Sequence, residues 1–426
     1  MTFTSEHLDG WERRLGDASA RVADDFPGES PERQPVHTVY GGAHLFSAGT
    51  AGRLGELAQD FAERWVPDPS DLGEVLGLED ELAERVHGAV LEKLGREPVE
   101  DFRIDFEDGY GNRPGEEEDG HARSAALEVV KGMEAGSLPP FIGIRVKALT
   151  RELHDRSLRT LDLFLTTLLG ETGSLPDGFV VTLPKIQHVE QVEVLVEALG
   201  ELESALAVGE IPIELMIETP QTVLAPDGTS GARKWVGAGK GRVRGAHFGT
   251  YDYTASLNIT AAHQTMEHPA CDFARHALQV SLAGTGVWLS DGATNVMPVS
   301  EDRDSVHRVL RLHYDHVRHS LSHGYYQGWD LHPAQLVTRY AAVYAFFLEG
   351  LEKAGARLSH FVESAAKATL MGEVFDDAAT GQGLLNYFLR AIACGAITPE
   401  EATSRTGLTP SELQARSFPR IIEGRG

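Results

Sequence analysis

Short apolar runs recur along the chain, and each is followed by residues whose apolar positions have helical spacing. From the second run onward the starts lie roughly 30 to 45 residues apart, which is the length of one strand, one helix and their loops. Several runs are nearly continuous in Val, Ile, Phe and Leu, as in parallel strands that are covered on both faces. The expected strands are His37–Phe46, Asp101–Phe106, Phe141–Val146, Gly178–Lys185, Ile213–Glu218, Gly245–Phe248, Val287–Leu289 and Trp329–His332.

Helical patterns lie between these runs. Val189–Leu206 and Ser305–Leu321 each carry apolar residues at helical spacing. Two more helices, near Gly52–Trp65 and Leu78–Leu94, fill the longer interval between the first and second strands. Eight strands with intervening helices favour a closed barrel over an open doubly wound sheet. The predicted fold is therefore α/β, a (β/α)8 TIM barrel with a helical C-terminal extension.

The chain divides into three expected parts. These are an N-terminal helical segment at 1–36, a TIM-barrel catalytic domain at 37–336 and a helical extension or lid at 337–426. The extension contains an apolar stretch, Val337–Leu351, and a loop rich in Asp and Gly, Gly372–Gly383. It would serve as an extra subdomain, as a lid, or as an arm that reaches a neighbouring subunit.

Composition limits the classes of function. Hydrophobic residues make up 42% of the 426 positions and charged residues 24%, as in ordinary globular proteins. The net charge of −26 argues against binding to nucleic acid or to an anionic membrane. A small anionic substrate remains compatible, because a metal or a few arginines can reverse the potential inside a cleft.

The sequence also predicts a cytoplasmic protein. Its two cysteines, Cys271 and Cys394, are too few for a disulfide framework or a cysteine zinc site, which fits a reducing compartment. The first residues are polar and charged, unlike a signal or transit peptide. No segment approaches the roughly 18 unbroken apolar residues that span a bilayer.

Polar residues close the predicted strands, where catalytic groups of such barrels gather. They are expected to line one cavity. They are Asp105, Glu107 and Asp108 after the second strand, Arg145 in the third, Lys185 in the fourth, Glu218 in the fifth, Asp252 after the sixth and His332 after the eighth.

Glu218 and Asp252 are the candidate metal ligands. Taken singly, each carboxylate has an ordinary explanation as a helix cap or a local ion pair. At the ends of neighbouring strands, however, two carboxylates point into one cavity and repel unless a proton or cation lies between them. Two carboxylates with waters and substrate oxygens suit Mg²⁺ or Mn²⁺.

Arg145 has two compatible interpretations. One is a structural ion pair with Asp105 or Glu107. The other is a bidentate clamp for a substrate carboxylate or an enolate oxygen, with the acidic neighbours fixing its geometry. Asp105 and Glu107 share one face of the strand and Asp108 begins the loop. This acidic cluster is either a solvated loop or an outer shell of the metal.

Six short motifs in this order resemble the citrate lyase beta-subunit and HpcH/HpaI aldolase family, which includes malyl-CoA lyases and other pyruvate-binding TIM barrels. The resemblance covers residues 37 to 336. The motifs are DFED at Asp105–Asp108, IRV at Ile144–Val146, LPK at Leu183–Lys185, IET at Ile217–Thr219, FGTYD at Phe248–Asp252 and GWDLHPAQ at Gly328–Gln335.

The resemblance implies roles for individual residues. Glu218 and Asp252 would hold Mg²⁺, and Arg145 would hold the carbonyl or enolate oxygen. Glu107 and Asp108 match the acidic pair that orders metal-bound water. Contacts to substrate are expected from Arg145 and from three residues of the LPK and FGTYD motifs, namely Lys185, Gly249 and Thr250. The implied reaction is reversible aldol or Claisen-type chemistry on an enolate, with the metal as Lewis acid.

Two features depart from the family pattern. Lys147 stands where the family often has asparagine, next to the expected metal. The loop after the fifth strand is enlarged and is either a solvated loop or a site for an anionic substrate tail. Its basic residues are Arg233, Lys234, Lys240, Arg242 and Arg244. No motif identifies a site for CoA.

The sequence offers several candidates for the group that transfers the proton. His44 follows the first strand and His121 follows the acidic loop, although both types of position are more often structural. Asp376 and Asp377 in the extension are a further option. Four histidines at helical spacing form either a metal stripe or, as the pattern favours, an ordinary helix face. They are His313, His316, His319 and His323.

The sequence therefore supports three hypotheses. The first is a metal-dependent carbon–carbon lyase (an aldehyde-lyase or oxo-acid-lyase) acting on a hydroxy or oxo acid. The second is a Claisen-type lyase, synthase or thioesterase that acts on an acyl-CoA ester. The third is a barrel that binds an oxo acid without catalysis. By analogy, the long extension suggests a homo-oligomer, either a trimer or a hexamer.

Overall fold

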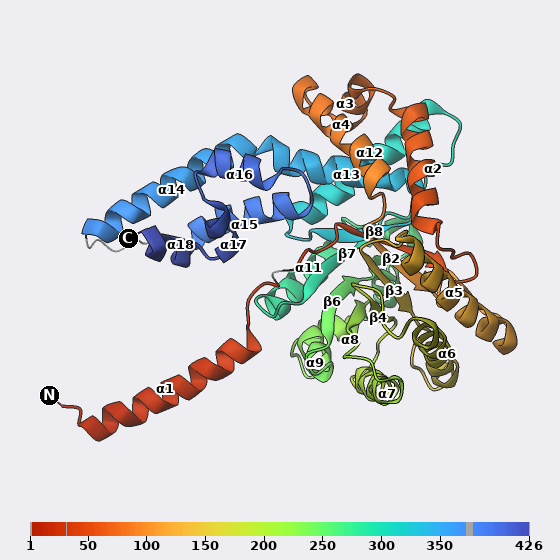
Figure 1. Ribbon diagram of the computed structural model, residues 1–426, viewed down its shortest axis with the longest axis horizontal. Coiled ribbons are helices and arrows are strands. Elements are labelled where there is room, and N and C mark those ends of the chain that lie inside the picture. Colours follow the sequence, from red (N-terminus) through yellow and green to blue (C-terminus); the bar gives the residue numbers. More distant parts are fainter. Residues whose placement is uncertain (1, 31, 372–377, 426) are drawn as a thin grey trace.

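The computed structural model describes residues 2–30, 32–371 and 378–425. Within them, eight parallel strands close into a barrel in chain order, with β8 returning to pair with β1 (Figure 1). All eight expected strands are present and differ only at their ends. They are β1 (His37–Gly42), β2 (Asp101–Asp105), β3 (Phe141–Arg145), β4 (Val180–Leu183), β5 (Ile213–Ile217), β6 (Val243–Phe248), β7 (Trp288–Ala293) and β8 (Gln327–Asp330).

Helices surround the barrel and bury the outward apolar side chains of the strands. The interval between β1 and β2 holds one more helix than expected, because the short α3 starts at the Asp68 cap and ends at the left-handed Gly77. The helices are α2 (Thr50–Trp65), α3 (Pro69–Leu76), α4 (Asp80–Arg96), α5 (Gly115–Ala135), α6 (His154–Thr172), α7 (Glu190–Leu206), α8 (Pro220–Val223), α9 (Gly231–Ala238), α10 (Thr250–Ser256), α11 (Pro269–Leu282), α12 (Arg303–Ser322) and α13 (Pro333–Glu349), with a 3₁₀ turn at Ala261–His263.

The C-terminal extension follows α13, which packs on α2, α4 and α12 and so crosses the expected boundary at residue 336. Its helices pack on one another beside the barrel (Figure 1). They are α14 (Leu351–Met371), α15 (Ala378–Ala393), α16 (Pro399–Thr406), α17 (Pro410–Ala415) and α18 (Phe418–Arg425). Arg390 donates to Gln34, 2.7 Å away and just before β1, so the extension contacts the amino end of the barrel. Asp376 and Asp377 lie outside the described residues.

The N-terminal helix α1 (Ser5–Asp25) projects away from the barrel, and none of its residues is buried (Figure 1). The division of the chain into parts at 1–36, 37–336 and 337–426 stays a prediction. No helix within the described ranges is both long enough and apolar enough to cross a membrane.

Charged side chains occupy the inside of the barrel below its carboxyl end. Arg103, on β2, is 1% exposed and hydrogen-bonds to Glu214 on β5 (2.7 Å) and to Thr182 on β4 (3.1 Å). It also pairs with Asp101. His247, on β6, lies 3.1 Å from Glu214 through Nε2. Buried charges of this kind are tolerable only because each has a partner.

Candidate active site at the carboxyl end of the barrel

Glu218 stands directly after β5 and is almost completely buried, at 2% exposure. Its Oε1 accepts a hydrogen bond of 2.5 Å from the backbone N–H of Lys185. On the other side lies Gly249, where an added Cβ would stand 2.6 Å from the Glu218 Cβ and 2.8 Å from Oε2. Burial, together with the negative charge of Asp252, raises the pKa of Glu218 to about 8. The glycine at 249 is therefore what leaves room for this carboxylate.

Asp252 lies in the first turn of α10, after the neighbouring strand β6, and its side chain is 48% exposed. Its Oδ2 is 4.0 Å from Nζ of Lys185. The structure thus brings Glu218 and Asp252 to adjacent strand ends as expected, with one buried carboxylate and one open to solvent.

Lys185 connects the acidic residues after β2 with Glu218 after β5. Its Nζ contacts Glu107 and lies 2.8 Å from Asp108, while its backbone N–H reaches Glu218. Lys185 has a φ of 50°, a left-handed conformation that non-glycine residues rarely adopt and that often marks functional sites. Burial alone would lower the pKa of Lys185, but its hydrogen bonds to Asp108 and Glu107 raise it above the ordinary value.

Arg145 is fixed by a bidentate pair with Asp105, at 2.7 Å from Nε and 2.5 Å from Nη2. The register of β2 and β3 places these two residues side by side. Its Nη1 lies 3.5 Å from Glu107, and the guanidinium stacks 4.6 Å above the ring of Tyr40. Burial would lower the pKa of Arg145, but the hydrogen bonds to Asp105 raise it, so Arg145 is a permanent cation. Its third nitrogen, Nη1, makes only long contacts, to Glu107 and to the Met216 sulfur, each at 3.5 Å.

The acidic pair after β2 is asymmetric. Burial raises the pKa of Glu107 against the charges of Arg145 and Lys185. Burial would also raise the pKa of Asp108, but the hydrogen bonds to Lys185 lower it below the usual range. Glu107 is thus the stronger base of the two, and Asp108 the more readily ionised carboxyl group.

Of the remaining expected site residues, Gly249 adjoins Glu218, whereas the side chains of Thr250 and His44 contact other residues. The hydroxyl of Thr250 donates to the Met266 sulfur at 3.1 Å, so this side chain is engaged away from Glu218. His44 packs against Tyr110 and His121, with ring centroids 5.5 and 6.1 Å away. No contact joins it to Arg145 or Glu218 within the described residues. The roles of His44, Gly249 and Thr250 towards a substrate stay predictions.

One contributor, Tyr40, was missed from the sequence, and Lys147 makes contacts other than those expected of a residue beside the metal. Tyr40 lies on β1 and Arg145 on β3, with β2 between them, so their stacking is not a contact between neighbouring strands. Lys147 turns away from the carboxylates and donates to the backbone oxygens of Phe106 (2.5 Å) and Gly111 (3.3 Å). Lys147 therefore anchors the acidic loop, and the D-x-R-x-D alternation in β2 was the available signal for the buried charges beneath it.

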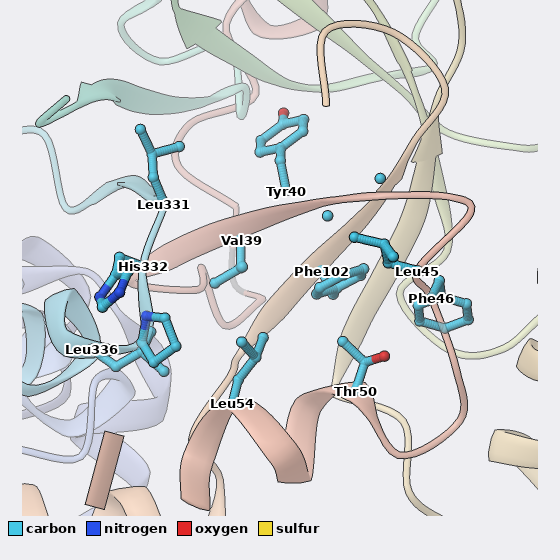
Figure 2. Close-up of a pocket in the computed structure, with 13 residues that line it drawn as sticks. Val39, Tyr40, Leu45, Phe46, Thr50, Leu54, Phe102, Leu331, His332 and Leu336 are labelled. Carbon is cyan, nitrogen blue, oxygen red and sulfur yellow. The ribbon is translucent and has the colours of Figure 1, made fainter. Parts of the chain in front are cut away.

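An apolar cavity of about 130 Å³ adjoins the site between β1, α2 and the loop after β8. Figure 2 shows the side chains of Phe102, Leu54 and Leu336 around it, with His332 at its edge. Tyr40 lines this cavity and also stacks on Arg145, so one ring separates the cationic clamp from an apolar compartment.

The basic loop does not reach the site. Arg244 is the second residue of β6, at the end opposite Phe248, and pairs with Glu32 at 2.8 Å. Arg242 pairs with Glu203, and Lys234 with Asp227. These pairs favour the interpretation of this segment as part of the outer surface.

The donor set suits a hard divalent cation. Five carboxylates and two cations meet at this end of the barrel, an excess of negative charge that a divalent ion would offset. The ligand atoms nearest the expected metal position are carboxylate oxygens, which Mg²⁺ and Mn²⁺ prefer, and Mg²⁺ commonly uses one or two protein carboxylates with waters. The residues present therefore fit the expected metal.

Comparisons with known proteins support the fold. A citrate lyase from Burkholderia xenovorans LB400 has a similar structure, with a TM-score of 0.58 and 18% identity over 88% of this chain and 97% of its own. This likeness confirms the TIM barrel that the sequence resemblance implied. A malate synthase from Haloferax volcanii, in its lead(II) complex, has a TM-score of 0.48 and 16% identity over 92% of this chain and 98% of its own. No curated protein sequence matches the chain significantly. The sequence profile of a family described as "Domain of unknown function (DUF6986)" matches residues 15–421.

Proposed function

The chain belongs to the DUF6986 family, and from its site we propose that it is a metal-dependent carbon–carbon lyase of the aldolase type. Its substrate would be a hydroxy or oxo acid that is cleaved through a pyruvate-like enolate. One observation carries the proposal. Lys185 reaches carboxylates from three strand ends, at Glu107 and Asp108, at Glu218 and near Asp252, which together leave an oxygen-lined site beside Arg145.

Glu218 and Asp252 would hold Mg²⁺ or Mn²⁺, and Lys185 fixes Glu218 through its backbone N–H. When bound, the ion would supply Lewis-acid polarisation of the 2-oxo group. Because burial favours the protonated form of Glu218, this residue must lose its proton as the ion binds.

Arg145 would bind the substrate oxygen that becomes negative. Asp105 and Tyr40 hold the guanidinium in one orientation, so no reorganisation is needed as charge develops. In a 2-oxo-4-hydroxy acid, the bond between C3 and C4 breaks. Its electron pair forms the enolate, and the C4 hydroxyl loses its proton and becomes an aldehyde.

Glu107 is the group that we assign to this proton transfer. It lies between Lys185 and Arg145, is mostly buried with a side chain 11% exposed, and has a raised pKa. It would take the hydroxyl proton, directly or through a water, and return it to C3 of the enolate to give pyruvate. The aldehyde part would extend towards the apolar cavity beyond Tyr40, so an apolar substituent at C4 should be favoured.

The test is pyruvate release from 4-hydroxy-2-oxo acids that carry hydrogen, methyl or phenyl at C4, with and without Mg²⁺. We expect Mg²⁺-dependent release that falls at least about 100-fold in Glu218→Gln and in Asp252→Asn. Glu193→Gln, an exposed carboxylate on α7, is the matched control and should keep full activity. Unchanged activity in either ligand variant would refute the metal assignment. Tight CoA binding without pyruvate release would favour the acyl-CoA hypothesis, and oxo-acid binding without turnover the non-catalytic one.

A further inference from the structure

Two helices on the outside of the barrel present a second group of metal-ligating side chains. Asp272 lies on α11, His319 on α12 and His323 at the C-terminal end of α12. One ligand atom from each lies within 4.8 Å of the other two, and within the described part of the chain no other set of three is this compact. Of the four histidines at helical spacing on α12, His313 and His316 hydrogen-bond to Thr338 and to Thr294. Only His319 and His323 therefore belong to this group.

The side chains are oriented for one common ligand. Nε2 of His319 lies 2.9 Å from Oδ1 of Asp272. Nδ1 of His323 donates to the backbone oxygen of His319 at 2.8 Å, which leaves its Nε2 free to bind a metal. The rings of His319 and His323 are 4.2 Å apart, as expected for neighbours one helical turn apart.

The surroundings hold this arrangement in place. Arg275, completely buried, donates to Asp272 at 2.8 Å and is itself neutralised by Asp291 at 2.9 Å. Gln279 donates to the backbone oxygen of His323 and so ties α11 to the end of α12. Two carboxylates with one guanidinium leave a net negative charge, so Arg275 does not cancel the attraction for a cation.

A fourth histidine lies close by. His276 is one turn beyond Asp272 on α11, and its ring is 5.4 Å from that of His323. Each helix thus supplies two potential ligands four residues apart, which are neighbours on one helix face. A structural ion pair between His319 and Asp272 would require neither His323 nor His276. It therefore does not explain why four such side chains lie together.

We propose that Asp272, His319 and His323 form a second metal site, for a transition metal such as Zn²⁺, that clasps α11 to α12. His276 or a water would complete a tetrahedral set. Two nitrogen ligands with one carboxylate favour Zn²⁺, Co²⁺ or Ni²⁺ over Mg²⁺. The all-oxygen site inside the barrel has the opposite preference, so the two sites differ in the metals that they select. This clasp does not depend on the proposed lyase activity.

The experiment uses the full chain, stripped with EDTA and titrated with Co²⁺, whose visible absorption reports tetrahedral nitrogen coordination, and then with Zn²⁺ against a chromophoric chelator. We expect one tightly bound ion per chain and a higher melting temperature with Zn²⁺. His319→Ala and His323→Ala should each weaken Zn²⁺ binding at least about 100-fold. His276→Ala decides whether histidine or water is the fourth ligand.

His154→Ala is the matched control. His154 also pairs with an aspartate, Asp155 at 3.2 Å, and also has Nδ1 on a backbone oxygen, but without a second histidine. It should bind Zn²⁺ like the wild type. Circular dichroism of each variant checks its fold. Absence of stoichiometric binding to the wild type, or equal binding by the folded His319→Ala and His323→Ala variants, would overturn the proposal.

Discussion

Gly249→Ala would test how closely the candidate metal site depends on the absence of one methyl group. The alanine Cβ would stand 2.6 Å from Cβ of Glu218 and 2.8 Å from its Oε2. Carbon atoms pack at about 3.5 to 4.0 Å, so Glu218 must move by about 1 Å. Backbone strain plays no part, because Gly249 has a negative φ of −97°.

Such a displacement should affect binding and turnover more than folding. Overpacking of this kind costs about 1 to 3 kcal/mol in the free energy of unfolding. A misplacement of about 1 Å in a catalytic group lowers turnover by roughly 100-fold. We therefore expect weaker binding of Mn²⁺, followed by electron paramagnetic resonance, and a loss of Mg²⁺-dependent pyruvate release in a protein that still folds.

Gly245→Ala is the matched control, because Gly245 lies on β6, the strand that Gly249 directly follows, and its added Cβ would also face a glutamate, Glu214 on β5. Its added Cβ would stand 3.5 Å from the nearest atoms of Glu214 and His247, which is ordinary contact. This variant should bind Mn²⁺ like the wild type. Wild-type Mn²⁺ affinity in Gly249→Ala would show that Glu218 is not held where the metal needs it, and would refute the reasoning.

Three further predictions concern the buried charges. Arg103→Met leaves Asp101 and Glu214 without the arginine that they share, and should lower the free energy of unfolding, measured in urea, by about 3 to 5 kcal/mol. The control Arg53→Met loses an exposed pair with Glu56 and should lower it by less than about 1 kcal/mol. Equal losses in the two variants would contradict this prediction. The folded-state pKa of Glu218, about 8, is above the ordinary 4.5, so its contribution to stability is complete below about pH 4.5 and is lost as the pH rises through 8. With EDTA present, the melting temperature of the wild type should therefore fall between pH 5 and pH 8.5 relative to Glu218→Gln, and parallel curves would exclude the raised pKa. The lysine of Arg145→Lys cannot make both contacts to Asp105, so this variant should release pyruvate at least about 100-fold more slowly. The exposed control Arg151→Lys should release it at the wild-type rate. A fully active Arg145→Lys variant would refute the role of Arg145 in binding the substrate oxygen.

The strands were predictable because the side chains that parallel strands turn towards the covering helices are apolar, and in several strands many of those on the inner face are apolar as well. Runs such as Ile213–Glu218 therefore stand out, and the polar residue that ends each run marks the carboxyl end of the barrel. The short helix α3 was not predicted, because its eight residues contain too little periodicity to separate it from its neighbours.

The contacts within the site were predictable only where they follow from neighbouring strands. The pair of Asp105 with Arg145 follows from the direct pairing of β2 with β3. The stack of Tyr40 on Arg145 joins strands that are not direct neighbours, because β2 lies between β1 and β3. The contacts of Lys185 depend on a left-handed backbone conformation that the sequence does not predict. The partner of His319 on α11 was likewise invisible, because helical spacing relates residues within one helix and not between two.

The charged interior of the barrel also limits how its sequence can change over time. Arg103, Asp101, Glu214 and His247 come from three strands, and each is acceptable in the interior only while the others are present. A lineage that lost one of them would have to replace the rest almost together, because the intermediates contain an unpaired buried charge. Homologous barrels should therefore carry these four residues as a set or share none of them, and this covariation would appear between positions that are far apart in the sequence.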